Sequence, residues 1–198
     1  MFQRFFSLLI GYVLGSFLTA VVVTKKYTGK DISEIGTGNP GMANVMAQIG
    51  RKAGIIVLLG DIAKTAFAMI ISYALFGISI ENYACLWAGL GAIIGHNHPF
   101  WRKFRGGKGV AVTVTWLILL MPIYGTFVSV IGGIITIITG FLPLGAVIIA
   151  FGAIPGAFYF YGMEYGIVVS IAALLMLSRH YRGILRILRK EEERKFRK

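Results

Sequence analysis

The stretch of sequence with the clearest chemical potential is residues 95–111, GHNHPFWRKFRGGKGVA. Gly106, Gly107 and Gly109 surround Lys108 there, between two long apolar runs. Glycines let the backbone turn its N–H groups toward a ligand, and the lysine adds a point charge beside them. A helix beginning near Val110 would direct its positive end at the same place. The segment therefore suits a bound phosphate, although a solvated basic loop between two membrane helices would have the same composition.

The same segment does not have the pattern of a nucleotide-binding P-loop. That pattern needs a serine or threonine directly after the lysine, to hold magnesium, and a further glycine at the start of the loop. Gly109 and Arg102 occupy these two positions here. The sequence therefore argues against a P-loop.

A second polar segment is the turn-rich run 36–44, GTGNPGMAN. Thr37 and Asn39 can donate side-chain hydrogen bonds, and Gly38 with its neighbouring glycines exposes backbone N–H groups. Arg51 lies shortly downstream. Either a tight loop or a binding site accounts for this composition.

Ionisable residues also occur within or beside the apolar runs. Asp61 and Lys64 are spaced i, i+3, so they would share a helix face and neutralise each other, as a structural pair or as part of a site. His96 and His98 flank Asn97. Two histidines at this spacing are a weak indication of a metal site when no carboxylate or cysteine lies nearby, so we expect no metal site. One such histidine could orient a substrate or transfer a proton.

The sequence lacks two common motifs of acyl transfer. No histidine is followed by an aspartate five positions later, and no G-x-S-x-G nucleophile turn occurs. An enzyme built from these segments would work by binding and positioning anions rather than through a covalent intermediate.

The composition indicates a membrane protein. Of 198 residues, 57% are hydrophobic and only 14% are charged, whereas soluble domains carry about 25% charged residues. The net charge of +12 is concentrated in short segments next to apolar runs, which argues against nucleic acid as a partner and for a lipid bilayer. The basic tail, residues 179–198, has the spacing of a helix that lies on anionic lipid.

Seven apolar stretches predict an all-α integral membrane protein with seven transmembrane helices in one domain, residues 1–198. They are residues 5–23, 54–76, 83–95, 110–121, 126–138, 146–161 and 165–177. With the N-terminus outside, the inner segments 24–53, 96–109, 139–145 and 178–198 hold 5, 4, 0 and 9 of the 20 Lys and Arg residues. The outer connections hold none, so the positive-inside rule predicts a cytoplasmic C-terminus and cytoplasmic polar motifs. Several stretches are shorter than the roughly 20 residues of a straight span, so some helices are expected to be re-entrant or to extend beyond the bilayer.

Taken together, the motifs resemble those of the bacterial acyl-phosphate-dependent glycerol-3-phosphate acyltransferases, the PlsY family, over nearly the whole chain. The matching segments, in order, are Gly15-Ser16, Gly38-Asn39-Pro40-Gly41-x-x-Asn44-Val45, Asp61-x-x-Lys64, Gly95-His96-x-x-Pro99, Phe104-x-Gly106-Gly107-Lys108-Gly109-Val110-Ala111 and Arg179-His180-x-x-x-Ile184-x-Arg186-x-Leu188.

This resemblance implies an enzyme of phospholipid biosynthesis in the bacterial inner membrane, with its active site facing the cytoplasm. It implies transfer of a fatty acyl group from acyl phosphate to the 1-hydroxyl of glycerol-3-phosphate, with release of lysophosphatidic acid and phosphate, by a monomer without a cofactor. Carried over by position, Lys108 and His180 would be catalytic. The phosphate-binding residues would be Ser16, Thr37, Gly38, Asn39, Asn44, Arg51, His96, Gly106, Gly107, Lys108 and Gly109.

The sequence departs from the family pattern in its later part. The family has an asparagine where this chain has Gly183, and a Thr-Arg-Tyr-x-Ser-Leu-type motif where it has residues 139–146. Gly140 replaces an arginine there, and Pro143 and Ala146 replace serines. Each lost charge-assisted hydrogen bond would weaken a two-phosphate site by about 1.5–3 kcal/mol. The alternative to the enzyme is therefore a diverged membrane protein that binds or transports an anion without catalysis.

Overall fold

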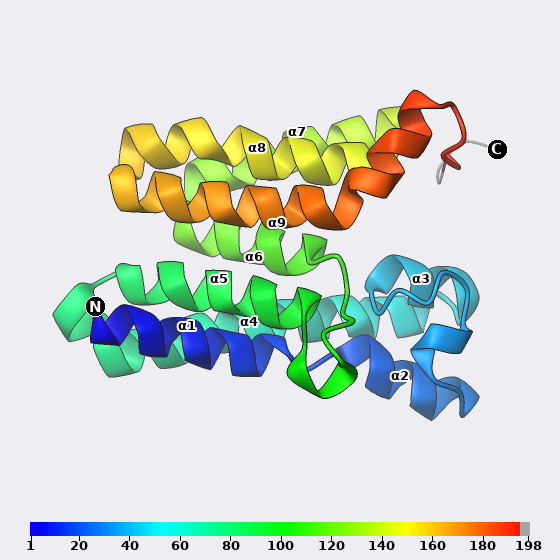
Figure 1. Cartoon of the computed structure of the whole chain (residues 1–198), viewed down its shortest axis with the longest axis horizontal. Helices are drawn as coiled ribbons and strands as arrows, with labels where there is room; N and C mark the ends of the chain where they lie inside the picture. The colour runs from blue at the N-terminus through cyan, green and yellow to red at the C-terminus, as the bar shows by residue number, and fades with distance from the viewer. Residues whose placement is uncertain (195–198) are drawn as a thin grey trace. The chain divides into compact units, whose positions relative to one another are not determined.

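The computed structural model describes residues 1–194, and within them every regular element is helical (Figure 1). The α-helices are α1 (Phe2–Gly15), α2 (Thr19–Thr28), α3 (Met42–Gln48), α4 (Arg51–Ile80), α5 (Tyr83–Asn97), α6 (Val110–Leu120), α7 (Pro122–Thr139), α8 (Leu142–Tyr161) and α9 (Met163–Leu188). Two short 3-10 helices are η1 (Ile32–Glu34) and η2 (Phe100–Arg102). The all-α class expected from the sequence is confirmed, while the end of the predicted basic tail, 195–198, lies outside the described residues.

The chain folds into two compact units. The first comprises Met1–Thr115, and the second begins at Trp116, inside α6. Helices α1 to α5 therefore belong to the first unit and α7 to α9 to the second. The expectation of a single domain stays a prediction.

Five helical stretches among the described residues are long and apolar enough to cross a membrane. They are Phe2–Thr28, which joins α1 and α2, and the helices α4, α7, α8 and α9. Helix α6 has 11 residues and α5 has 15, so the count of seven spans remains a prediction.

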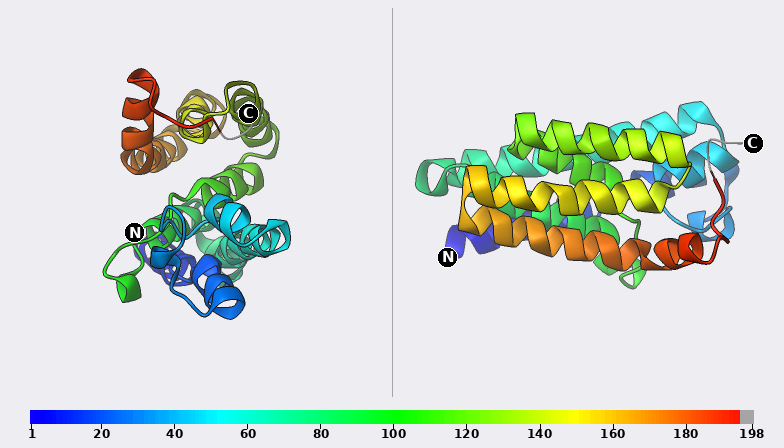
Figure 2. Two further views of the ribbon diagram at one scale, coloured as in Figure 1. Left: turned by 90° about the vertical axis from the view of Figure 1, so that its right-hand side faces the viewer. Right: turned by 90° about the horizontal axis from the view of Figure 1, so that it is seen from above.

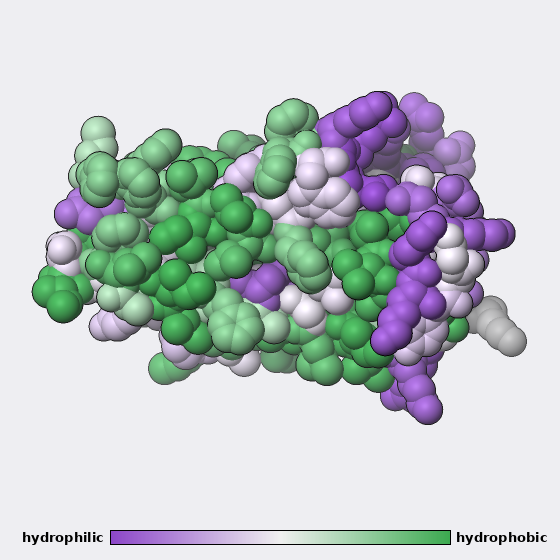
Figure 3. All heavy atoms as spheres, turned by 90° about the horizontal axis from the view of Figure 1, so that it is seen from below, coloured by the Kyte–Doolittle hydropathy of each residue, from purple (hydrophilic) through white to green (hydrophobic). Residues whose placement is uncertain are grey.

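Large apolar side chains face outward along these helices. On α1 the exposed residues include Phe5, Leu9 and Val13, which recur at every fourth position. The face drawn in Figure 3 consists mostly of hydrophobic residues, with the hydrophilic ones gathered toward one end. Extended apolar surfaces of this kind mark contact with lipid, in agreement with an integral membrane protein.

Helices α1 and α5 approach each other through glycines. A methyl group on Gly11 would overlap the carbonyl group of Ala88. A methyl group on Gly91 would overlap the carbonyl oxygen of Leu8 and lie 2.9 Å from the backbone nitrogen of Tyr12. Small residues let membrane helices pack backbone against backbone. This contact holds α5, and the polar segment that follows it, against α1.

The apolar run 5–23, expected to form one helix, is interrupted between α1 and α2. The carbonyl groups at the interruption receive hydrogen bonds from distant side chains. The Trp101 indole donates to the Ser16 carbonyl oxygen at 2.8 Å, and Lys64 Nζ donates to the Phe17 carbonyl oxygen at 2.9 Å. A buried carbonyl group without a partner costs free energy, so these two donors stabilise the interruption.

The polar segment between α2 and α4, which contains η1 and α3, is joined to the connection between α5 and α6 by an ion pair. Two nitrogens of the Arg102 guanidinium each lie 3.0 Å from a carboxylate oxygen of Asp31. Hydrogen bonds from Arg102 and Ser33 hold the pKa of Asp31 well below its usual value, and the same pair raises the pKa of Arg102. The two segments that carry the polar motifs are thereby tied together.

In the second unit, α7, α8 and α9 lie side by side with α8 in the middle (Figure 2). Glycines again allow close packing. A methyl group on Gly145 of α8 would overlap Thr136 Oγ1 of α7, and one on Gly183 of α9 would lie 2.6 Å from Pro143 Cγ of α8.

Replacing Gly91 by alanine is expected to lower stability, because the added methyl group would push α1 and α5 apart. We expect the free energy of unfolding to fall by about 1–3 kcal/mol, measured as a lower midpoint of thermal unfolding in detergent. Gly133→Ala is the matched control, because a methyl group there meets nothing within 4 Å and alanine stabilises a helix by about 0.5–1 kcal/mol over glycine. Equal midpoints for the two variants would contradict the close backbone contact.

Replacing Asp31 by asparagine is expected to lower the unfolding midpoint at neutral pH and to matter less in acid. Because the folded-state pKa of Asp31 is depressed, its contribution is present above the unfolded-state pKa of about 3.9 and is lost as the pH falls toward the folded value. The midpoints of both proteins should therefore be compared near neutral pH and near pH ~3. If the unfolding midpoints of the two proteins differ by the same amount at both pH values, the ion pair is not the source of the difference.

Candidate active site

The asparagine–proline–glycine loop before α3 is shaped by Asn44. Gly36 and Gly38 have φ of 56° and 70°, a backbone conformation that favours glycine. Asn44 Oδ1 accepts a hydrogen bond from the Thr37 backbone nitrogen at 3.0 Å. Asn44 Nδ2 donates to two loop carbonyl groups, one of them that of Asn39 at 3.2 Å. Asn44, expected to bind phosphate, thus uses its amide group to hold the loop.

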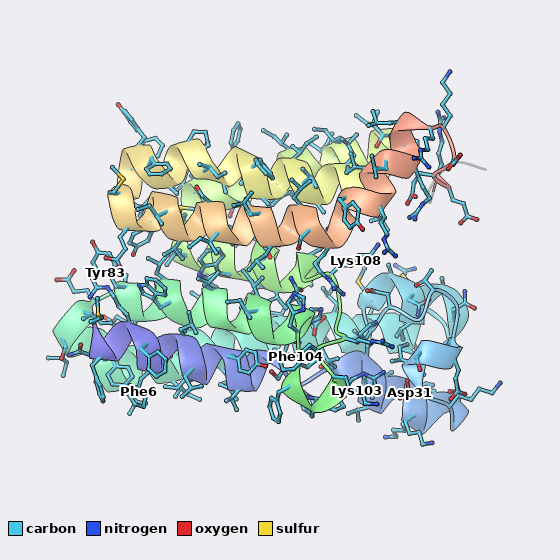
Figure 4. The ribbon with its side chains drawn as sticks, viewed as in Figure 1. Phe6, Asp31, Tyr83, Lys103, Phe104 and Lys108 are labelled. Carbon is cyan, nitrogen blue, oxygen red and sulfur yellow. The ribbon has the colours of Figure 1, made fainter. Side chains whose placement is uncertain are left out.

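The glycine–lysine loop, Gly106 to Gly109, leads into α6. The Gly106 nitrogen donates to the carbonyl oxygen of Asn97 at 3.1 Å, and the Gly107 nitrogen donates to that of His96 at 3.0 Å. These two N–H groups, which were expected to face a phosphate, are directed at the end of α5. Lys108 lies beyond them, close to the start of α6 (Figure 4). Its side chain is therefore the strongest candidate in the loop for contact with an anion.

Gly109 closes the loop at the first turn of α6. Its φ is 78°, and a methyl group there would lie 2.6 Å from Oδ1 of the buried Asn97. The Thr113 nitrogen donates to the Gly109 carbonyl oxygen at 2.8 Å, which begins the helix. Both the backbone conformation and the close approach of Asn97 require glycine at this position.

The two polar loops meet at Gly107. A methyl group on Gly107 would overlap Nε2 of His96 and would lie 2.9 Å from the carbonyl oxygen of Pro40. The glycine–lysine loop, the end of α5 and the asparagine–proline–glycine loop therefore come together within the first unit. That these motifs bind substrate remains a prediction.

His96 belongs to a buried network with α4, made of Asp61, Lys64 and His96. Lys64 Nζ lies 2.8 Å from Asp61 Oδ1 and 2.8 Å from His96 Nδ1. The separation of His96 Nδ1 from Asp61 Oδ1 is longer, 3.6 Å. The pairing of Asp61 with Lys64 expected from their spacing is confirmed. Their contact with His96 joins two helices and could not be inferred from spacing.

The remaining expected site residues are distributed over both units. The buried Ser16 donates its hydroxyl group to the Tyr12 carbonyl oxygen at 2.7 Å. Arg51 is the first residue of α4 and is exposed. His180 is a buried residue of α9 in the second unit, with Nδ1 2.9 Å from the Met176 carbonyl oxygen. Their roles stay predictions.

The groups gathered around Gly107 are suited to binding an anion. Lys108 supplies positive charge there, and Asp61 and Lys64 compensate each other inside the protein. Among residues 1–194, no group of three or more His, Cys, Asp and Glu side chains could hold a metal ion. A lysine beside loop glycines suits chemistry by positioning and charge stabilisation.

The positions at which the sequence is expected to depart from the family pattern lie in the second unit. Gly140 ends α7 with a φ of 79°, and a methyl group on it would lie 2.9 Å from Cβ of Arg194. The guanidinium carbon of Arg194 is 5.6 Å from the centroid of the Phe141 ring. A cation of the tail thus reaches the segment 139–145, which has no Lys or Arg of its own.

Sequence reasoning missed the residues that support the two loops from a distance. They are Trp101 on the Ser16 carbonyl oxygen, Tyr12, whose hydroxyl group donates to the His98 carbonyl oxygen at 3.1 Å, and Asp31. The partners of these side chains are 71 to 86 positions away in the chain. Composition and spacing give no signal for contacts of that range.

Known proteins are similar to this chain in sequence and in fold. Residues 5–190 match the glycerol-3-phosphate acyltransferase family. The chain is 39% identical over 183 residues to glycerol-3-phosphate acyltransferase 1 of Lactobacillus johnsonii, which covers 92% of this chain and 88% of the relative. It is 32% identical over 192 residues to glycerol-3-phosphate acyltransferase 2 of Bacillus cereus, with 97% and 95% covered.

Two solved structures similar to this chain are of the same kind of protein as these relatives. The fold is similar to that of PlsY (YgiH), an integral membrane glycerol 3-phosphate acyltransferase, in its glycerol 3-phosphate form, with a TM-score of 0.85, 27% identity and coverage of 96% of this chain and 94% of that one. The lysophosphatidic acid form gives a TM-score of 0.82, 26% identity and the same coverage. The chain belongs to the glycerol-3-phosphate acyltransferase family.

Proposed function

We propose that this protein transfers a fatty acyl group from acyl phosphate to the 1-hydroxyl of glycerol-3-phosphate. The products are lysophosphatidic acid and inorganic phosphate, and the reaction uses no cofactor. The family and its relatives support acylation of glycerol-3-phosphate. The acyl phosphate donor rests on the resemblance of the motifs to those of the PlsY family.

The observation that carries the proposal is the meeting of two polar loops at Gly107. The loop with Lys108 and the loop with Asn39 and Pro40 are far apart in the sequence but share this junction. Both substrates carry phosphate, so a site made of loop glycines and a lysine matches what they have in common.

The reaction needs no nucleophile from the protein. The hydroxyl oxygen of glycerol-3-phosphate attacks the acyl carbon and forms the new ester bond. The bond between that carbon and the phosphate oxygen breaks, and phosphate departs with the electron pair. The hydroxyl proton goes to a phosphate oxygen of one substrate. Lys108 stabilises the departing phosphate and the developing oxyanion, and His180 is proposed as a second catalytic residue on the basis of the resemblance.

The proposed setting is the bacterial inner membrane, crossed seven times by a monomer. The segregation of Lys and Arg supports an outer N-terminus and a cytoplasmic C-terminus. In this topology the two polar loops face the cytoplasm, where glycerol-3-phosphate would enter, and the acyl chain would lie among the helices toward lipid.

A second candidate function is anion binding or transport without acyl transfer. It is favoured by Gly140, Pro143 and Ala146, which replace an arginine and two serines of the family motif. Purified protein supplied with acyl phosphate and glycerol-3-phosphate separates the two, with lysophosphatidic acid measured by mass spectrometry. Product formation supports the enzyme, and binding of glycerol-3-phosphate without product supports the alternative. Acyl-CoA in place of acyl phosphate tests the donor.

Replacing Lys108 by alanine is expected to lower the turnover of acyl transfer by about 10²- to 10³-fold, the effect of removing one stabilising group from a charged transition state. Lys103→Ala is the matched control, because Lys103 is a cation of the same connection that lies at its exposed tip (Figure 4). Its turnover should stay close to that of the unaltered protein. Unchanged turnover of Lys108→Ala would remove Lys108 from the reaction.

A further inference from the structure

The buried network of Asp61, Lys64 and His96 has no step of the proposed reaction assigned to it, beyond the phosphate contact expected of His96. All three side chains are almost fully buried, with exposed fractions of 3%, 6% and 3%. A buried ammonium group needs several partners to offset its loss of water. Lys64 has three, which are Asp61 Oδ1 at 2.8 Å, the Phe17 carbonyl oxygen at 2.9 Å and His96 Nδ1 at 2.8 Å.

These distances determine which ring nitrogen of His96 carries the proton. An ammonium group has three donors and no acceptor, so a ring nitrogen 2.8 Å away must accept. The competing arrangement would place a proton on Nδ1 and donate it to Asp61, but the separation of 3.6 Å is too long for a hydrogen bond. With Lys64 charged by its pairing with Asp61, the state of His96 that fits these distances is the neutral tautomer with its proton on Nε2.

The other side of the ring faces the loop junction. His96 Nε2 lies so close to Gly107 that no side chain fits between them, and the carbonyl oxygen of Pro40 borders the same position. The backbone of His96 contributes as well, because its carbonyl oxygen accepts from the Gly107 nitrogen at 3.0 Å. One residue thus contacts the glycine–lysine loop through both its ring and its main chain.

We propose that Lys64 is a positioning residue that fixes His96 as the Nε2–H tautomer and so presents an N–H donor at the junction of the two loops. Asp61 and the Phe17 carbonyl group hold the ammonium group in place for this purpose. The donor stabilises the loop conformation that carries Lys108. The kinetic consequence rests on the proposed function, whereas the tautomer does not.

The tautomer is tested directly by nitrogen NMR of the full-length protein labelled with ¹⁵N-histidine in detergent micelles. The three histidines are assigned with His96→Gln, His98→Gln and His180→Gln. We expect a protonated, pyrrole-type Nε2 and an unprotonated Nδ1 for His96. A protonated Nδ1, or a doubly protonated ring, in the unaltered protein would overturn the proposal without any variant at the network.

Two neutral double variants isolate the role of the lysine. The double variant Asp61→Asn with Lys64→Gln keeps a hydrogen-bond donor near His96 and leaves no buried charge. The double variant Asp61→Asn with Lys64→Met removes that donor but has a side chain of similar size at position 64. We expect the glutamine variant to keep the Nε2–H tautomer and the methionine variant to shift toward the Nδ1–H tautomer. Identical His96 spectra in both variants would overturn the role of Lys64.

The same pair of variants tests the effect on the reaction. The methionine variant should lose turnover by up to about 10²-fold relative to the glutamine variant, the scale of a displaced catalytic group, with little change in KM for glycerol-3-phosphate. Equal turnover of both variants, with the tautomer shifted, would contradict the positioning role. If the unaltered protein forms no lysophosphatidic acid, the proposed function fails, and the NMR result still decides the tautomer.

Discussion

Buried backbone groups need hydrogen-bond partners, and this need determines how the polar segments of the first unit are arranged. Where α1 gives way to α2, the carbonyl groups of Ser16 and Phe17 accept from Trp101 and Lys64 instead of from their own helix. In apolar surroundings water cannot replace these donors. Because the donors come from the α5–α6 connection and from α4, the same hydrogen bonds that satisfy the backbone also bring the polar segments together.

In the first unit, two cations are each paired with a nearby carboxylate group. Asp61 compensates Lys64 inside the protein, and Asp31 compensates Arg102 near the surface. The nitrogens of Gly106 and Gly107 are engaged by carbonyl groups of α5. For the proposed binding of an anion at the loop junction, this leaves the Lys108 side chain as the main candidate, while a part for the glycine N–H groups stays a prediction. At Gly107 the lack of a side chain lets the loop, the histidine ring and the neighbouring loop approach closely.

Much of this arrangement could be predicted from the sequence. Apolar runs placed most helices, and i, i+3 spacing paired Asp61 with Lys64, because both patterns depend on local geometry. The interruption after α1 could not be predicted, since its donors are far away in the chain. Nor could the third contact of Lys64, with His96. That the glycines expose N–H groups to a ligand stays a prediction, and nothing in the sequence indicated that their lack of a side chain allows the close approaches at a crowded junction.

The close contact between Gly183 and Pro143 links the residue types that these two positions can hold. Pro143 Cγ occupies the space that any side chain at position 183 would need, so an asparagine at position 183 requires a smaller or displaced residue at position 143. Both are positions at which the sequence is expected to depart from the family pattern, and this packing gives a physical reason for the two to change together. A chimera that takes its last helix from a relative with asparagine at 183 must take residue 143 from that relative as well.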